Sequence, residues 1–318
     1  MRAALILQCG QLPVVAAHEP PPSGGVRVAV TAAPITPLDV LCASGTSYFG
    51  APPVPYVPGV QGVGALPDGT PVWFATDAGM RPGDGSMAEY CHVPPADIVE
   101  LPPDADPALV AALGLSAVAA WQSLTSCGDL RTGEQVLVLG GGGIVGQAAI
   151  QIARLLGARR VVAACRSSRA RSRAAALGAD AVVPLLDDDT VPDLAARLRP
   201  ALDGPLDLVL DPLFGVPAAA ALQVLRPGGR LVNLGGSAAP TAPFDSATLR
   251  SGSLRILGYT NNSLTKPERA ETMRTIAAHA AAGRLTVSYE AVPLSDVSAA
   301  WQTQSTGSAT SRLVLLLR

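Results

Sequence analysis

The sequence predicts an α/β protein with two domains, one a doubly wound parallel sheet and the other smaller and mostly β. The chain has 318 residues, which is more than a single domain usually contains. Short apolar runs among many prolines and glycines fill the first hundred residues, whereas strand and helix patterns alternate from Gln135 onward. Such alternation is typical of a parallel sheet covered by helices on both faces.

Six apolar runs in the second half of the chain are the predicted parallel strands. Helical patterns separate them, among them Leu194 to Leu198, Ala218 to Leu225 and the longer Pro267 to Ala282, which ends at Gly283. The predicted strands are Val136 to Leu139, Val161 to Cys165, Ala181 to Pro184, Leu206 to Leu210, Arg230 to Leu234 and Leu254 to Gly258.

The boundary between the two domains is expected near Ala105, where a long helical pattern begins with an aspartate cap and a proline near its first turn. After Gly283 the pattern becomes strand, helix and strand again. The tail from Leu285 to Arg318 is therefore expected to complete the N-terminal domain, which would make that domain discontinuous in sequence.

The segment from Val136 to Arg166 has the pattern of strand, glycine turn, helix and strand. Gly141, Gly143 and Gly146 have the G-x-G-x-x-G spacing at the start of the helix, which favours a dinucleotide site because glycines let the backbone approach a pyrophosphate. A glycine turn with no ligand is the alternative. The residues predicted to bind the diphosphate are Gly141, Gly142, Gly143, Ile144, Val145 and Gly146.

The end of the second strand of this unit indicates which coenzyme fits. A site that prefers NAD usually places an acidic residue there, but this chain has arginines and serines instead. Guanidinium groups and hydroxyls suit the 2′-phosphate of NADP(H), so Arg166, Ser167 and Arg171 are predicted to bind it. The alternative is that these arginines are only the solvated first turn of a helix, and for Arg173 we favour solvent.

Composition is that of an ordinary globular protein. Apolar residues make up 48% of the chain, charged residues 15%, and the net charge is −2, which does not favour a nucleic-acid partner. The five cysteines are scattered and odd in number, which fits a reducing cytoplasm. The apolar stretch from Pro107 to Trp121 is short for a membrane span and contains Gly114 and Ser116, so we expect a buried helix and no membrane partner.

Four blocks of sequence carry a family resemblance, namely APITPLDVLCASGTSY from Ala33, YVPGVQGVG from Tyr56, GLSAVAAWQSL before the glycine loop and VLRPGGRLVNLGG from Val224. They resemble the medium-chain dehydrogenase/reductase superfamily, in its zinc-free quinone oxidoreductase and enoyl reductase branch. The resemblance spans essentially the whole chain. It implies a GroES-like substrate domain, residues 1–115 completed by 286–318, and a Rossmann NADP(H)-binding domain, residues 116–285. It also implies a homodimer formed through the edge of the Rossmann sheet.

The resemblance also shows where this chain departs from relatives that use zinc. The positions where those relatives carry a cysteine and a His-Glu pair correspond to Thr36, Val60 and Gln61, and the structural zinc lobe with four cysteines is absent. We therefore predict that the protein binds no metal.

Further site residues are assigned by the resemblance alone. Ser116 is expected near the coenzyme, and two segments are expected to approach the nicotinamide, namely Asn233, Leu234 and Gly235, and Gly258, Tyr259 and Thr260. Tyr48 is the predicted proton donor, with a role as a pocket wall as the alternative and Tyr56 as a weaker substitute. Thr36 is the second catalytic candidate.

The predicted activity is the NADPH-dependent reduction of quinones or of the C=C bond of α,β-unsaturated carbonyls by hydride transfer without zinc. Conjugated substrates fit because an isolated ketone is harder to reduce without a Lewis acid. Two alternatives stay open: an NADPH-binding protein that does not turn over, and a biosynthetic reductase of a specialised metabolite.

Overall fold

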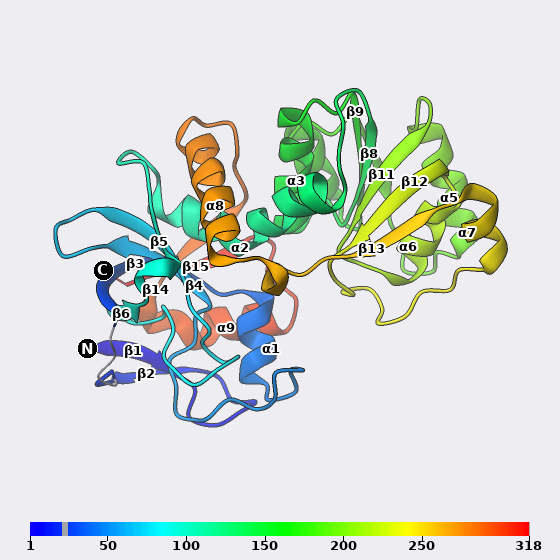
Figure 1. Cartoon of the computed structure of the whole chain (residues 1–318). Coiled ribbons are helices and arrows are strands. Elements are labelled where there is room, and N and C mark those ends of the chain that lie inside the picture. Colours follow the sequence, from blue (N-terminus) through cyan, green and yellow to red (C-terminus); the bar gives the residue numbers. More distant parts are fainter. Residues whose placement is uncertain (21–24, 318) are drawn as a thin grey trace. The chain divides into compact units, whose positions relative to one another are not determined.

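A computed structural model describes residues 1–20 and 25–317 of the chain (Figure 1). The chain divides into two compact units, the first formed by Met1–Gly114 with Thr265–Arg318 and the second by Leu115–Leu264. Helix α2, Pro107–Gln122, crosses the first boundary and is interrupted there, because Gly114 has the non-helical angles φ 29° and ψ −132°. The π-helix η2, Ser123–Cys127, follows it directly.

The second unit contains the six parallel strands that the sequence predicts. Their order, β10-β9-β8-β11-β12-β13, is that of a doubly wound sheet, in which the strand order reverses beside the first strand. The fold class is therefore confirmed. The strands are β8 (Gln135–Leu139), β9 (Arg160–Cys165), β10 (Ala181–Pro184), β11 (Leu206–Asp211), β12 (Leu225–Asn233) and β13 (Arg255–Gly258).

Helices cover both faces of this sheet, with α3 on one side and α5 and α6 on the other (Figure 1). The apolar sides of α5 and α6 pack on β8, β9 and β11 to form the core of the unit, which includes Leu137, Val162 and Leu194. The helices are α3 (Ile144–Leu155), α4 (Ser168–Ala176), α5 (Val191–Leu198), α6 (Gly215–Leu222) and α7 (Ser246–Gly252), with short 3₁₀ turns η3 (Arg199–Ala201) and η4 (Asn261–Ser263).

The first unit is built on a seven-stranded sheet, in which β14, β15, β3, β4, β5 and β7 are neighbours in that order and β6 pairs with β3. A separate hairpin joins β1 and β2. The strands are β1 (Arg2–Leu5), β2 (Val14–Ala17), β3 (Val26–Pro34), β4 (Gln61–Ala65), β5 (Pro71–Ala75), β6 (Tyr90–Val93), β7 (Ile98–Glu100), β14 (Tyr289–Pro293) and β15 (Arg312–Leu316). The helices are α1 (Pro37–Ala43), α8 (Lys266–Ala281) and α9 (Val297–Ser305), with 3₁₀ turns η1 (Pro95–Asp97) and η5 (Leu294–Asp296).

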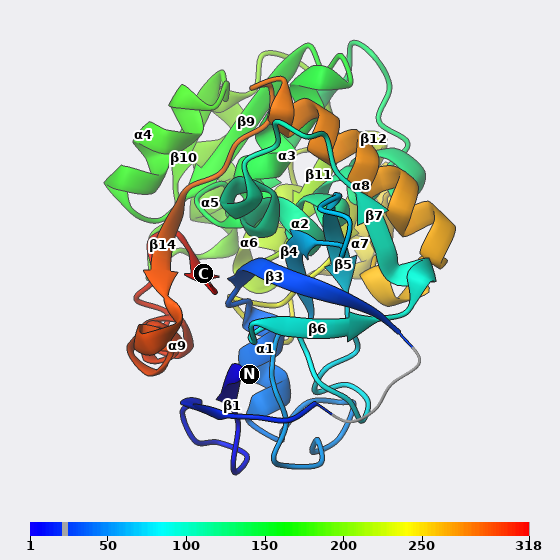
Figure 2. The ribbon, with the colours of Figure 1, turned by 90° about the vertical axis from the view of Figure 1, so that its left-hand side faces the viewer.

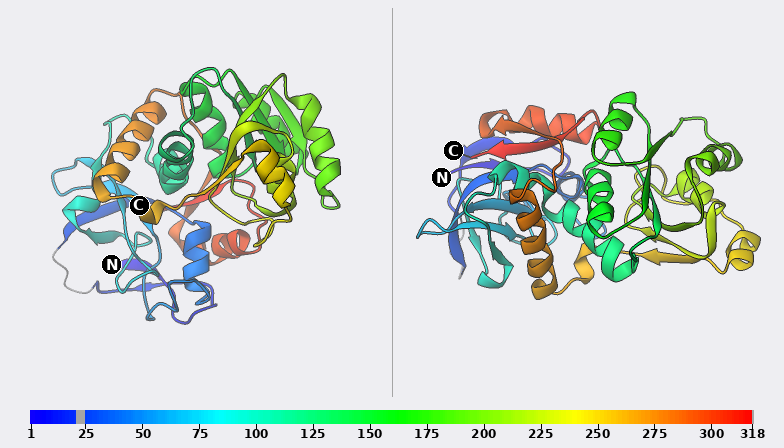
Figure 3. Two further views of the ribbon diagram at one scale, coloured as in Figure 1. Left: turned by 45° about the vertical axis from the view of Figure 1, so that its right-hand side comes forward. Right: turned by 90° about the horizontal axis from the view of Figure 1, so that it is seen from above.

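The C-terminal segment returns to the N-terminal sheet. Strand β15 pairs antiparallel with β3, with Leu315 opposite Ala33, so that the red and blue strands lie side by side in Figure 3. Trp301 of α9 and Leu313 of β15 join the same buried core as Val28 of β3. These contacts explain why the tail folds with the first residues of the chain rather than with the nearer parallel sheet.

One helix differs from the sequence-based assignment. We predicted that the Rossmann domain extends to residue 285, but the structure places α8 in the first unit, where it lies beside β7 (Figure 2). Lys266 and Arg269 form ion pairs with Asp97 at 2.6 and 2.5 Å, and the buried side of the helix includes Met273 and Ile276. The buried apolar side of α8 and its ion pairs with Asp97 both have partners far away in sequence, which the local pattern does not reveal.

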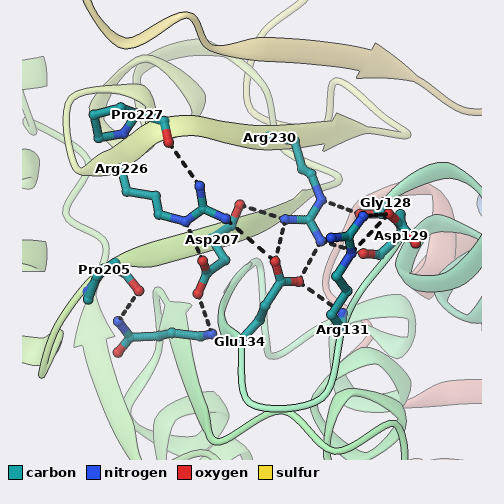
Figure 4. Close-up of polar contacts among 10 residues, drawn as sticks. Gly128, Asp129, Arg131, Glu134, Pro205, Asp207, Arg226, Pro227 and Arg230 are labelled. Carbon is teal, nitrogen blue, oxygen red and sulfur yellow. Dashed lines mark hydrogen bonds and ion pairs between the residues drawn. The ribbon is translucent and has the colours of Figure 1, made fainter.

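An ion-pair network ties together the amino ends of the strands in the second unit (Figure 4). Arg230, which is 3% exposed, donates to both carboxylate oxygens of Glu134 and to the carbonyl oxygens of Gly128 and Asp129. Arg226 pairs with Asp207 and Glu134. A buried charge without partners lowers the stability of the fold, which explains why the Arg230 guanidinium has so many hydrogen-bond acceptors around it.

Candidate functional site

The predicted coenzyme residues of the second unit gather at one edge of its sheet. Because the strands are parallel, the segments that follow β8, β9, β12 and β13 all leave the sheet at its carboxyl edge. Ligands of open α/β sheets bind at this edge, where the strand order reverses. The ion-pair network of Arg230 lies at the opposite edge and is separate from this site.

The glycine loop is tightly packed, and the packing explains its composition. Gly140 has φ +66°, a conformation that favours glycine. A Cβ on Gly142 would lie 2.5 Å from the Cβ of Ala170 in α4. A Cβ on Gly146 would lie 2.7 Å from the Cα of Gly141 and closer still to the carbonyl oxygen of Gly140. The loop therefore excludes side chains at these positions for steric reasons.

Helix α3 begins directly after this loop and lacks a side-chain cap. Its N-cap residue is Gly143, which has no side chain to accept the backbone N–H groups of the first turn at Ile144, Val145 and Gly146. Gln147 Nε2 donates to the carbonyl oxygen of Gly142 at 2.8 Å and supports the loop from behind. An uncapped helix N-terminus attracts anions, because its N–H groups and dipole both favour negative charge.

The residues after β9 form the start of α4. Ser167 is the N-cap of that helix, and its hydroxyl accepts a hydrogen bond from the Ala170 N–H at 3.1 Å, which leaves the hydroxyl proton available to a ligand. Arg171 Nη1 donates to the Arg166 carbonyl oxygen at 2.6 Å, which holds the guanidinium of Arg171 at the strand end. Burial raises the pKa of Cys165 to about 11, so this thiol is uncharged at neutral pH.

The ends of β11 and β12 are joined through a buried carboxylate that the sequence analysis missed. Asp211 accepts hydrogen bonds from the N–H groups of Leu213 and Phe214 and from Asn233 Nδ2. Burial raises its pKa above the usual range. The Asn233 amide also donates to the carbonyl oxygen of Gly235, so the predicted Asn233–Gly235 segment is held in a defined shape.

The segment after β13 makes the remaining contacts. Tyr259 donates its N–H to the Asn233 carbonyl oxygen at 2.8 Å, and its hydroxyl donates to Asn261. Asn261 in turn reaches the carbonyl oxygen of Leu115, the neighbour of the predicted residue Ser116. Hydrogen bonds thus join the Asn233–Gly235 and Gly258–Thr260 segments to each other and to the neighbour of Ser116, while the binding roles of these residues stay predictions.

The two catalytic candidates belong to the first unit, and each has a specific environment. Thr36 is the N-cap of α1. Its hydroxyl donates to Asp39 Oδ2 at 2.6 Å and accepts from the Asp39 N–H at 3.2 Å, which uses its only proton. Tyr48 is 77% exposed and lies against Phe49, with ring centroids 4.2 Å apart. Both catalytic roles stay predictions.

The positions that carry zinc ligands in related enzymes have other roles in this chain. Asp39 is buried and accepts hydrogen bonds from Thr36 and from the Val60 N–H. Gln61 Oε1 accepts from the Trp73 indole N–H at 3.1 Å. Within the described ranges, no group of three or more His, Cys, Asp or Glu side chains is placed to hold a metal ion.

The sequence revealed the glycine loop and the arginines but not the supporting residues. Gly140 was visible as the first of four consecutive glycines, a signal for one more constrained position. No recognised motif marks the supporting residues, because their roles depend on partners far away in the chain. These residues are Asp211, Ala170 and Asn261.

One helical stretch of the described chain, Pro107–Cys127, is long and apolar enough to cross a membrane by length and composition. Two thirds of its apolar window, 67%, is buried within the protein, as in the core helix of a globular fold. The prediction of a buried helix therefore accounts for this segment.

Comparison with known proteins agrees with the geometry. Residues 145–278 match the family model described as zinc-binding dehydrogenase. The chain is 30% identical, over 99% of its length, to part of a phenolphthiocerol/phthiocerol polyketide synthase of Mycobacterium tuberculosis. It is 29% identical to the quinone oxidoreductase of Lama guanicoe, with 92% of this chain and 89% of that protein covered.

A solved structure, the quinone oxidoreductase of Thermus thermophilus, superposes with a TM-score of 0.83 at 26% identity and covers all of both chains. That enzyme was also solved in complex with NADPH. The chain belongs to the medium-chain dehydrogenase/reductase superfamily of oxidoreductases, in its quinone oxidoreductase branch, as the sequence blocks indicated. It spans only about 15% of the length of the polyketide synthase relative.

Proposed function

We propose that the chain binds NADP(H) and reduces quinones or the C=C bond of α,β-unsaturated carbonyls by hydride transfer, without zinc. One observation supports this most strongly. The uncapped start of α3 follows a loop in which Gly142 and Gly146 have no room for side chains, and Arg166, Ser167 and Arg171 follow β9 where an NAD-preferring protein carries an acid. The relative from Thermus thermophilus, solved with NADPH, supports the same choice.

The residues present fit this coenzyme. The free N–H groups of the first turn of α3 suit a diphosphate, and the guanidinium forks of Arg166 and Arg171 suit the 2′-phosphate. When bound, NADPH supplies a hydride, and the substrate also takes up one proton. The chain contributes the orientation of the ring, through the segments after β12 and β13.

Zinc independence rests on the donor chemistry of three positions. The side chain of Val60 is apolar, Gln61 is engaged by Trp73, and the hydroxyl of Thr36 is engaged by Asp39. Neutral oxygens already hydrogen-bonded in this way are poor ligands for zinc, which takes thiolate and imidazole. We expect activity to survive incubation with EDTA.

The relatives favour a narrower version of the activity. Several of the similar curated proteins are polyketide synthases, among them the 30% identical one from Mycobacterium tuberculosis. We therefore propose that a reductase of a biosynthetic intermediate is the second candidate. A protein that binds NADPH without turnover is the third, because Thr36 has its proton engaged and Tyr48 is mostly exposed to solvent.

The test is a titration followed by a turnover assay. NADPH fluorescence should change on binding, with a much weaker response to NADH, and NADPH absorbance should fall when a quinone or enone is added. Binding with no oxidation across a panel of quinones, enones and enoyl thioesters would favour the third candidate. Oxidation only with enoyl thioesters would favour the second. No fluorescence response at millimolar coenzyme would rule out all three.

The remaining assignments follow from the same interpretation. We propose a homodimer with a small-molecule substrate, located in the cytoplasm, with no nucleic-acid or membrane partner. The low net charge and the scattered free cysteines support this assignment.

A further inference from the structure

Asn261 occupies a bridging position in the second unit that no motif indicates. It opens the turn η4 directly after the segment that follows β13. Its Nδ2 donates to the carbonyl oxygen of Leu115 at 2.9 Å, across 146 positions of sequence, and its Oδ1 accepts the hydroxyl of Tyr259 at 2.7 Å. One carboxamide therefore links the end of β13 to the second half of α2.

The link continues across the carboxyl edge of the sheet. The Tyr259 N–H donates to the carbonyl oxygen of Asn233. The Asn233 side chain donates to Asp211 Oδ2 at 2.9 Å and to the Gly235 carbonyl oxygen at 2.7 Å. A continuous set of hydrogen bonds thus joins the ends of β11, β12 and β13 to Leu115.

The chemistry of the bridge requires an amide. Asparagine has both a donor and an acceptor, and here each is used once. A carboxylate has no donor and would face the carbonyl oxygen of Leu115 with negative charge. Burial raises the pKa of the Tyr259 hydroxyl, so this group keeps its proton and stays a donor.

We propose that Asn261 is a positioning residue for the nicotinamide half of NADP(H). The inference rests on the proposed function, which places Ser116 and the segment Gly258 to Thr260 beside the nicotinamide. Asn261 fixes the spacing between these two segments by holding Leu115 and Tyr259 together. By the same proposal the glycine loop and Arg171 hold the other half of the coenzyme, and the hydrogen bonds that support them, from Gln147 and to the Arg166 carbonyl oxygen, lie outside this bridge.

Two different ligands test the two halves of the proposed coenzyme site. 2′,5′-ADP carries the adenosine and the 2′-phosphate but no nicotinamide, whereas NADPH carries both, and calorimetry gives the affinity of each. We expect Asn261→Ala to weaken NADPH by roughly tenfold and to leave 2′,5′-ADP within about twofold, because about two hydrogen bonds of ordinary strength are lost. Asn261→Asp should weaken NADPH at least as much, and Tyr259→Phe by less.

Ser263→Ala is the matched control. Ser263 lies in the same turn, and its hydroxyl donates to the Thr260 carbonyl oxygen at 2.8 Å without reaching α2. This variant should bind both ligands as the wild type does. Among active variants, Asn261→Ala should also lower kcat more than it raises KM for the substrate, since a misplaced ring affects the transfer step.

Two results would overturn the inference about Asn261 and leave the proposed function intact. Equal losses of NADPH and 2′,5′-ADP affinity in Asn261→Ala, with a lower melting temperature, would make the bridge a structural element of the whole unit. Unchanged NADPH affinity in both Asn261 variants would remove it from the coenzyme site. If the wild type binds neither ligand, the proposed function fails first and the inference falls with it.

Discussion

The arginines after β9 decide coenzyme choice in our proposal, and their geometry allows a prediction for each one. Arg166→Ala and Arg171→Ala should each weaken NADPH by roughly 10- to 100-fold and NADH by little, because a charge-assisted hydrogen bond to the 2′-phosphate is lost. Arg171 has the firmer position, since its guanidinium is anchored on the Arg166 carbonyl oxygen. Fluorescence titration with both coenzymes measures the effect.

Arg173→Ala is the control for this pair. Arg173 lies further along α4, where it is half-buried, and we expect it not to reach the phosphate. The variant should keep the NADPH affinity of the wild type. Equal losses for NADPH and NADH in Arg166→Ala would remove that residue from the phosphate site.

Tyr56 offers a prediction about stability. Its ring belongs to the core of the first unit and is 4% exposed, and among the described residues its hydroxyl has no hydrogen-bond partner. Burying a polar group without a partner costs free energy, so Tyr56→Phe should leave the free energy of unfolding unchanged or raise it by about 1 kcal/mol. Urea unfolding is the measurement.

A second tyrosine provides the contrast. The Tyr289 hydroxyl donates to Asp106 Oδ2 at 2.7 Å, so Tyr289→Phe removes a hydrogen bond that is made. That variant should be less stable than the wild type. A Tyr56→Phe variant that loses more stability than Tyr289→Phe would show that the Tyr56 hydroxyl has a partner, such as water, in solution.

The glycine loop and helix α3 allow a prediction for a whole element. In Gly146→Ala the new Cβ would meet the backbone of Gly140 and Gly141 at distances that real Cβ atoms do not show. We expect a loss of about 1–3 kcal/mol in the free energy of unfolding, despite the better helix propensity of alanine, and no measurable NADPH binding.

Gly143→Ala is the matched substitution in the same loop. Its Cβ would lie 3.6 Å from the Gly140 carbonyl oxygen, which is ordinary contact, and its φ of −75° suits alanine. Its stability should change by less than about 1 kcal/mol. If Gly146→Ala and Gly143→Ala have the same free energy of unfolding, close packing is not the reason why residue 146 is a glycine.

The network around Arg230 gives a second prediction for elements, because it joins β12, β11 and the segment before β8 (Figure 4). Arg230→Ala would leave the half-buried Glu134 without its main partner and would leave the carbonyl oxygens of Gly128, Asp129 and Asp207 without this donor. We expect a loss of about 3–5 kcal/mol in unfolding free energy. Arg131→Ala, which removes only an exposed pair with Asp129, should have little effect in the same urea experiment.

Local sequence patterns were enough to predict the elements that carry their own signal. Five of the six strands were found within one residue because buried parallel strands are apolar runs between turns, whereas β12 begins at Leu225, five residues before the predicted start. Gly157 ends α3 with φ +86° as a helix-ending glycine should. Helix α7 was missed, since its sequence SATLRSG has no apolar period. Its start is visible only through the cap that Asp245 forms with Thr248.

The parts that sequence could not predict depend on contacts between distant residues. Helix α8 packs in the first unit through its buried side and through Asp97, which lies 169 positions from Lys266. In the candidate site, the glycines and arginines were found because their chemistry is local, whereas Asp211 and Asn261 act through backbone groups that only the folded sheet brings near. The residues that support a site from a distance in sequence are therefore the ones that a single sequence does not predict.

At the scale of the whole molecule, the open edge of the parallel sheet predicts how copies associate. Strand β13 pairs with β12 and, among the described strands, has no partner on its other side. Its Ile256 is 36% exposed. An exposed apolar edge invites pairing, and a two-fold axis would set β13 antiparallel to β13 of a second copy.

We therefore expect a dimer in light scattering after gel filtration, and a monomer for Ile256→Lys, because lysine on an edge strand opposes pairing. Leu186→Lys is the control, since Leu186 follows β10 at the other edge of the same sheet and is 51% exposed. The monomeric variant should still bind 2′,5′-ADP, because the glycine loop and Arg171 lie within one copy. Dissociation by Leu186→Lys but not by Ile256→Lys would move the interface to the β10 edge, and a monomeric wild type would contradict the dimer.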